Sequence, residues 1–389
     1  MMLQPKNLNM ILKRVADGSD AAIAQQNLMI GVVKGDTKMI QSFVDRGADV
    51  NACDERGVPP ILLAVAYGHA SILKLLVKLG AHVNARDYDG TTPIFVAAQE
   101  GHADLIKTLT KLGCDVNSAA RDGTTPVYIA AHNGHANAVK ILIKAGAVFG
   151  SVGNNRNFPI IAAAGQGQVG VIEVLAELGD NMDMKTIHGA TPMTFAAEGG
   201  HVGAIRALAK LGADVNSASD DGSTPVNVAV QNGKVDAIRA LAELGANIHT
   251  PNINGTSPIC MAAEKGDVSA IKVLAQLGGD VNASSDGMTP VVMAACQGHA
   301  AAIKVLYKLG ADMNPDCRWS VKDVAVQCNH TEAVELIEKI LAKMTKECET
   351  CGCMSKRLKV CSKCEKVRYC SRECQVQDYK KHKKECFSV

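Results

Sequence analysis

A proline recurs every 33 residues through most of this chain of 389 residues, and a glycine follows each one at a constant distance. A fixed interval of this length is typical of a chain built from one repeated unit, which is too small to bury its apolar face without neighbours. The repeated positions are Pro60, Pro93, Pro126, Pro159, Pro192, Pro225, Pro258 and, after 32 residues, Pro290, in step with Gly80, Gly113, Gly146, Gly179, Gly212, Gly245, Gly278 and Gly310.

Residues 90–122 illustrate the secondary structure that the sequence predicts for one unit. Thr92 stands directly before the proline, which suits a capped first turn, and a short apolar segment follows. A second helix is predicted from Ile106 and Leu109, which share one face because they are three residues apart. Gly113 is placed to end that helix in a left-handed conformation, before a turn rich in Asp, Asn and Gly. Each unit is therefore an amphipathic helix pair whose core is completed by stacking.

The period, the Thr-Pro pair, the Gly-His pair and the Gly-Ala-Asp-Val-Asn stretch together resemble the ankyrin repeat. The resemblance implies an all-α repeat solenoid of helix-turn-helix units with connecting turns and hairpins. It covers residues 27–343 in about ten units, of which the first and last are degenerate. Residues 1–26 are expected to form an N-terminal cap or extension, with a helix over residues 7–16. The family recognises proteins through the concave surface of its turns and first helices.

The repeats depart from the family at the second position after the proline, where a histidine often ties down the turn. Because other residues stand there, we expect that bond to be absent throughout. They are Leu62, Phe95, Tyr128, Ile161, Thr194, Asn227, Cys260 and Val292.

Several side-chain types in the body are predicted to be structural. The histidines of the Gly-His pairs are interpreted as turn residues, and the scattered cysteines as small core or loop residues. The loop tips, expected at residues 117–119, 216–218 and 282–284, are mostly small and suggest no binding hot spot. The five histidines are His69, His102, His135, His201 and His299, and the six cysteines are Cys53, Cys114, Cys260, Cys296, Cys317 and Cys328.

Eight of the 14 cysteines lie in the last 42 residues. Seven of them, with one histidine, form four closely spaced pairs that suit two closed, structural tetrahedral zinc sites. In a reducing compartment this pattern favours metal over the alternative of a disulfide knot. A segment with so few apolar residues depends on the metal for its folding free energy. The pairs are Cys348 with Cys351, Cys361 with Cys364, Cys370 with Cys374, and His382 with Cys386.

The order of these pairs, with Tyr369 before the fifth ligand and Gln375 after the sixth, resembles the MYND finger over about residues 348–386. The resemblance implies two interleaved zinc ions and leaves Cys353 as a spare. The first ion would be held by Cys348, Cys351, Cys370 and Cys374, and the second by Cys361, Cys364, His382 and Cys386.

MYND fingers bind proteins, often through short proline-rich peptides held by a Gln and a Trp. Gln375 matches that pattern, whereas Tyr379 stands where Trp is usual. Two interpretations stay open: a retained but weaker peptide site, or a Tyr379 that only packs against the zinc core. The finger segment, residues 344–389, is also basic. Residues 348–389 carry a net charge of +6 against −4 for the rest of the chain, and we interpret the lysine run as a solvated helix face.

We interpret the whole chain as a non-enzymatic, monomeric, intracellular adaptor or scaffold for protein–protein interactions. One alternative is a transcriptional or chromatin regulator with nucleic-acid or corepressor contacts through the finger. A less favoured alternative is a methyltransferase-related enzyme, although residues 1–347 are occupied by repeats and leave no chain for a cofactor pocket. No catalytic residue, small-molecule substrate or membrane partner is expected, since the N-terminus resembles no secretory signal and no stretch is long and apolar enough to span a membrane.

The unit over residues 156–188 is predicted to be the least stable. Phe158 replaces the capping threonine, and the loop before it lacks the Asp-Val-Asn pattern. Hydrogen exchange measured by mass spectrometry should therefore show faster exchange in this unit than in the units on either side. Equal protection of all three would contradict the prediction.

Overall fold

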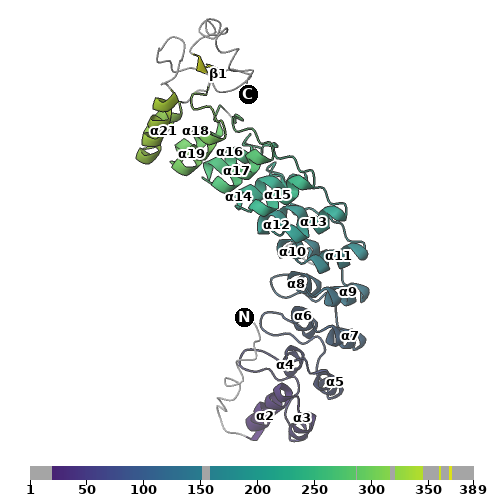
Figure 1. The fold of residues 1–389 in the computed structure, drawn as a ribbon. Helices are drawn as coiled ribbons and strands as arrows, with labels where there is room; N and C mark the ends of the chain where they lie inside the picture. Colours follow the sequence, from purple (N-terminus) through teal and green to yellow (C-terminus); the bar gives the residue numbers. More distant parts are fainter. Residues whose placement is uncertain are drawn as a thin grey trace. The chain divides into compact units, whose positions relative to one another are not determined.

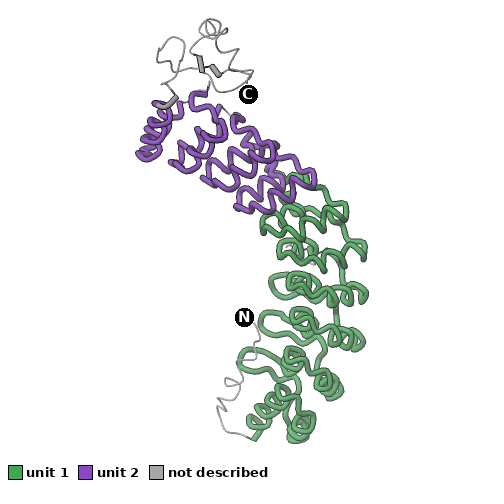
Figure 2. The backbone as a smooth tube through the Cα atoms, in the orientation of Figure 1, with its two compact units in different colours: residues 1–220 green, residues 221–389 purple. Residues whose placement is uncertain are grey.

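The computed structural model describes residues 20–150, 158–285, 287–315, 320–344, 359–360 and 368–369 (Figure 1). The chain divides into two compact units, residues 1–220 and 221–389 (Figure 2). Within each unit the helices form pairs stacked in chain order, which confirms the predicted all-α repeat array. The predicted helix over residues 7–16 lies outside the described residues.

The described part of the first unit holds six pairs of helices. They are α2 (Asp20–Lys34), α3 (Thr37–Val44), α4 (Pro60–Ala66), α5 (Ala70–Lys78), α6 (Pro93–Gln99), α7 (Ala103–Lys111), α8 (Pro126–His132), α9 (Ala136–Lys144), α10 (Pro159–Gly165), α11 (Val169–Glu177), α12 (Pro192–Gly199) and α13 (Val202–Lys210).

The described part of the second unit holds four more pairs of helices and one pair of short strands. They are α14 (Pro225–Gln231), α15 (Val235–Glu243), α16 (Pro258–Glu264), α17 (Val268–Gln276), α18 (Pro290–Cys296), α19 (Ala300–Lys308), α20 (Val321–Gln327), α21 (Thr331–Met344), β1 (Lys359–Val360) and β2 (Arg368–Tyr369).

The first helix of each full repeat begins at the recurring proline, as the sequence predicts. The proline loses no hydrogen bond at the first helical position, because the amide groups of that turn have no partner within the helix. Where a threonine precedes the proline, its hydroxyl oxygen can accept the amide of the third helical residue. Thr92 accepts from Phe95 in this way at 3.4 Å, and Thr125 from Tyr128 at 3.3 Å. Phe158 caps α10 without such a bond.

The second helices supply a recurring pair of large apolar side chains to the core. In α7, Ile106 and Leu109 are fully buried, and the same pair recurs buried in the other full repeats. The helix ends where Gly113 takes a φ of +81°, as predicted. First helices pack on first helices and second helices on second helices, α6 on α8 and α7 on α9 for example. Fully buried alanines such as Ala97 and Ala98 line these contacts, which explains a core with few aromatic residues.

The terminal helices differ from the internal ones. Helix α2 has 15 residues and α21 has 14, against seven to nine for the helices between them. In α21, Ile337 is fully buried, but Val334 remains partly exposed. The predicted inner pair of the last repeat is therefore only half covered, because no further repeat packs on α21 within the described residues.

Histidines connect neighbouring repeats. Four of the predicted turn histidines lie over the preceding repeat, where their Nε2 atoms lie within hydrogen-bonding distance of a main-chain carbonyl oxygen that can only accept. These pairs are His69 with Val33, His135 with Gln99, His201 with Gly165 and His299 with Glu264, at 2.9–3.0 Å, and His330 pairs with Cys296 in the same way. The histidines are structural, as the sequence indicates.

The asparagine of the Asp-Val-Asn stretch, predicted only as part of a turn, makes a second connection between repeats. The side chain of Asn117 accepts from the amide of Val148 and donates to the carbonyl oxygen of Gly146, both at 3.1 Å. Asn51 joins the next repeat through His82 and Gly80 at 2.9 and 3.0 Å. One amide side chain thus satisfies a donor and an acceptor of the following repeat.

The positions two residues after the proline follow no single rule. The thiol of Cys260 is fully buried and lies 3.6 Å from the carbonyl oxygen of Ala283, so at this repeat a thiol contacts the following turn where the family has a histidine. Thr194 instead forms a reciprocal capping box with Thr191. Asn227 is fully buried, and neither polar atom of its side chain has a hydrogen-bond partner.

Asp180 stands where most repeats have a buried alanine, such as Ala147 or Ala213. Its Oδ1 accepts from the amide of Asn181 at 2.8 Å, but its Oδ2 is buried without a partner. Burial raises the pKa of this carboxyl to about 6, above its ordinary value of 3.8. The charged form therefore destabilises the fold.

We predict that Asp180→Ala raises the free energy of unfolding at neutral pH by about 1–2 kcal/mol, a figure reduced for the partial exposure of the side chain. The folded-state pKa is raised, so the penalty is fully present above about pH 6 and disappears below about pH 4. Urea unfolding across this range measures the gain. Asp89→Ala, at an exposed acid, is the control and should change little. A gain that persists below pH 4 would contradict the assignment.

Candidate functional site

The zinc and peptide residues predicted from the sequence all lie outside the described residues. They are Cys348, Cys351, Cys361, Cys364, Cys370, Cys374, His382, Cys386, Gln375 and Tyr379.

Two short strands are described in this part of the chain. β1 and β2 are antiparallel, with Lys359 opposite Tyr369 and Val360 opposite Arg368. The start of β1 and the end of β2 therefore lie at the same end of the ladder. In the sequence, the first ligand pair precedes β1 and the third pair begins directly after β2.

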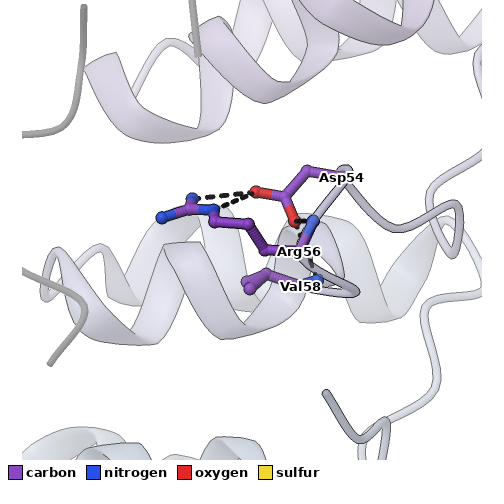
Figure 3. Close-up of polar contacts among 3 residues, drawn as sticks. All are labelled: Asp54, Arg56 and Val58. Carbon is purple, nitrogen blue, oxygen red and sulfur yellow. Dashed lines mark hydrogen bonds and ion pairs between the residues drawn. The ribbon is translucent and has the colours of Figure 1, made fainter. Parts of the chain in front are cut away.

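Several of the described hairpins are built around one polar side chain at the tip. Asp54 Oδ1 accepts from the amides of Arg56 and Val58 at 3.0 and 2.9 Å, and the Arg56 guanidinium lies 2.8 Å from Oδ2 (Figure 3). Asp87 accepts from the amides two and four residues later at 3.0 and 2.8 Å. Such Asx turns fix the hairpin without a regular ladder of strands.

Neighbouring hairpins are also joined to one another. Arg86 donates to the carbonyl oxygens of Gly90 and Ala119 at 2.9 and 2.8 Å and to the hydroxyl of Ser118. The amide of Arg121 donates to the carbonyl oxygen of the preceding tip at 2.9 Å. The amides of Asp220 and Ile253 make the same bond to the carbonyl oxygens of His188 and Asp221, both at 3.0 Å, so hydrogen bonds join several neighbouring hairpins among the described residues.

The predicted loop tips are wrong. Ser118, expected at a tip, is buried, and the tips lie three to five residues further along the chain. The tips were expected to be mostly small, but three other hairpins carry large side chains at the tip. Tyr88, Ile187 and Ile253 are 62%, 62% and 72% exposed there. The Asp-x-x-Gly spacing could have located the tips, because the two residues between the Asp and the Gly of an Asx turn lie at the apex of the hairpin.

A polar cavity of about 550 Å³ lies within the second unit. It is bounded by the hairpin over residues 252–256 and by the ends of α14, α16 and α18, which is the side that the ankyrin resemblance implies for partners. Met261 is its one apolar lining residue and is buried, and the exposed Ile253 belongs to the same hairpin. The lining residues are Gln231, Asn252, Asn254, Thr256, Met261, Glu264, Lys265 and Gln297.

The lining suits uncharged polar groups. Amide side chains of Asn and Gln can donate and accept together, as the main chain of an extended peptide also does. The opposite formal charges of Glu264 and Lys265 cancel. Asn252 is already engaged, since its Oδ1 accepts from the amides of Asn254 and Thr256 at 3.1 and 3.0 Å. The amides of Gln231 and Gln297 lie on exposed helix ends.

The described residues contain neither a metal-binding cluster nor a membrane-spanning helix. Within the described ranges, no group of three or more His, Cys, Asp or Glu side chains is arranged to hold a metal ion. None of the helices that the structure describes is long and apolar enough to cross a membrane.

Comparison with known families agrees with both resemblances. Ankyrin repeats (3 copies) match residues 28–120, 112–186, 178–252, 244–317 and 259–348, and the MYND finger matches residues 348–386. Among curated proteins, no relative matches. Both families are protein-interaction modules that are typically non-catalytic, and a MYND finger implies zinc binding. The chain belongs to the ankyrin-repeat family and ends in a MYND finger.

Proposed function

We propose that this protein is a non-enzymatic, intracellular adaptor with two separate protein-binding surfaces. The ankyrin array, residues 27–343, holds one partner, and the zinc finger, residues 344–389, holds a short peptide of another. Residues 1–26 cap or extend the array. The observation that carries the proposal is the succession of two protein-interaction families along one chain.

The cavity beside α16 supports the proposal for the array. Its amide-lined wall and the exposed Ile253 offer hydrogen bonds beside an apolar contact, the combination found at protein interfaces. The partner segment that fits best is an extended stretch with uncharged polar side chains and one apolar residue.

The pairing of β1 with β2 supports the interleaved zinc assignment. It brings together the two chain ends that lead to the first and third ligand pairs. We therefore propose that Cys348, Cys351, Cys370 and Cys374 hold one zinc ion. The second is held by Cys361, Cys364, His382 and Cys386. When bound, these ions stabilise the finger, and Gln375 and Tyr379 contact the peptide.

Zinc content tests the ligand assignment. We predict two zinc ions per chain in the purified protein, because eight ligands fill two closed sites. Cys351→Ser should lower that content. Cys353→Ser is the matched control, since the proposal gives this neighbouring thiol no ligand role, and it should leave the content unchanged. Loss of zinc in the Cys353 variant would overturn the assignment, and elemental analysis of the full chain measures it.

Partner capture tests the two-surface proposal. Full-length protein should lose one set of cross-linked partners when Ile253→Asp and Gln297→Arg are combined, because charge then enters the groove. A different set should be lost with Cys370→Ser. Lys304→Glu, on an exposed helical position, is the control and should lose neither. If both variants kept every partner of the wild type, the adaptor proposal would fail. A set that is lost when DNA is removed from the extract would instead favour the regulator alternative.

A further inference from the structure

Two thiols in the second unit lie side by side. Cys296 is the last residue of α18, and Cys328 directly follows α20. Their Sγ atoms are 3.7 Å apart, and both cysteines are free and partly exposed. Among the residues that the structure describes, they are the one pair of cysteines whose sulfur atoms lie within contact distance. Neither contributes to the finger or to the lining of the cavity.

Their proximity follows from the repeat geometry. Helices α18 and α20 are neighbouring first helices and pack against each other. The residue after a first helix lies over the last residue of the preceding first helix. Asn133, for example, donates from Nδ2 to the carbonyl oxygen of Gln99 at 2.9 Å. Cys328 and Cys296 occupy these two positions in the last two repeats, where thiols replace the side chains of the asparagine and the glutamine.

The main chain around the thiols is held in place. The ring of His330 hydrogen-bonds through Nε2 to the carbonyl oxygen of Cys296 at 2.9 Å. Asn329, between the second cysteine and this histidine, has a φ of +60°, the left-handed conformation that other repeats reserve for glycine. That turn directs His330 back onto α18. The two cysteines are thus fixed next to each other by a bond that does not involve their side chains.

We propose that Cys296 and Cys328 form a redox site that a peroxide converts into an intramolecular disulfide. One thiolate attacks the peroxide, releases water or an alcohol after protonation, and becomes a sulfenic acid. The neighbouring thiol then attacks that sulfur, and a second water leaves. The peroxide gains two electrons, and the dithiol loses two electrons and two protons. A dithiol reductant reverses the reaction by thiol–disulfide exchange.

The geometry requires little movement. A disulfide has an S–S length of about 2.0 Å, so the sulfurs must approach by about 1.7 Å, which side-chain rotation can supply. Burial, and then the hydrogen bond with Cys328, raises the pKa of Cys296. Little thiolate forms there at neutral pH, and oxidation is therefore expected to be slow. The product would fasten α20, next to the end of the array, to α18.

Peptide mapping of the oxidised full-length protein tests the proposal. The folded protein is treated with hydrogen peroxide, blocked with iodoacetamide in denaturant, and cleaved with trypsin. Cleavage at the flanking lysines leaves Cys296 in peptide 273–304 and Cys328 in peptide 323–339, each with a single cysteine. We expect these two peptides to be recovered linked, lighter than their sum by two hydrogen atoms, and to separate with dithiothreitol.

Matched variants control for other cysteines. Cys328→Ser should abolish the linked peptide. Cys114→Ser removes a partly buried thiol elsewhere in the array, whose pKa burial raises to about 11, and should leave the linked peptide unchanged. Peroxide should also slow hydrogen exchange in α20 and α21 in the wild type but not in Cys328→Ser. The proposal is overturned if peptide 323–339 stays fully alkylated, or if Cys296 is recovered as a sulfinic acid or linked to another cysteine.

Discussion

Everything in the described array depends on one apolar contact, the burial of each second-helix pair against the repeat beside it. Ile106 and Leu109 are fully buried, yet α7 alone could cover neither. Each such side chain contributes about 1.5–3 kcal/mol when removed from water, and a helix of nine residues is too short to be stable in isolation. The helices therefore exist because they are stacked. The long α2 and α21 agree with the same constraint, since within the described residues the first and last pairs have a neighbour on one face only.

Hydrogen bonds between repeats fix how neighbouring repeats are aligned across this apolar contact. Apolar stacking alone would tolerate sliding, whereas the histidine and asparagine connections each reach a specific main-chain atom of one neighbour. His135 reaches Gln99 on the helical side, and Asn117 reaches Gly146 near the hairpins. A repeat held at both places has one register. The same geometry brings the thiols of Cys296 and Cys328 together. The contacts that align the last two repeats therefore also place two oxidisable side chains next to each other.

Much of this fold could be predicted because it is determined by short-range sequence patterns. The proline at each helix start, the glycine at each helix end and the apolar pair between them depend on local chemistry that recurs in every unit. The hairpin tips were misplaced because a turn rich in Asp, Asn and Gly has several possible apices, and only the hydrogen bonds of Asp54 and Asp87 select one. The cavity beside α16 was also missed, since its lining comes from three repeats. The zinc ligands remain a prediction from spacing, because they lie outside the described residues.

The repeat that lacks one residue shows where the array tolerates change in length. Pro290 follows Pro258 after 32 residues, and the shortened segment is the hairpin, where Ser285 pairs with Met288 and its hydroxyl reaches the carbonyl oxygen of Gly255 at 2.6 Å. Across this deletion the His299 bond spans 35 residues instead of 36 but keeps a length of 2.9 Å. The alignment of neighbouring repeats is therefore set by these hydrogen bonds and not by the number of residues in each repeat. The hairpins are therefore natural points for inserting a reporter or a new binding loop, while the helix pairs would accept no insertion without losing alignment.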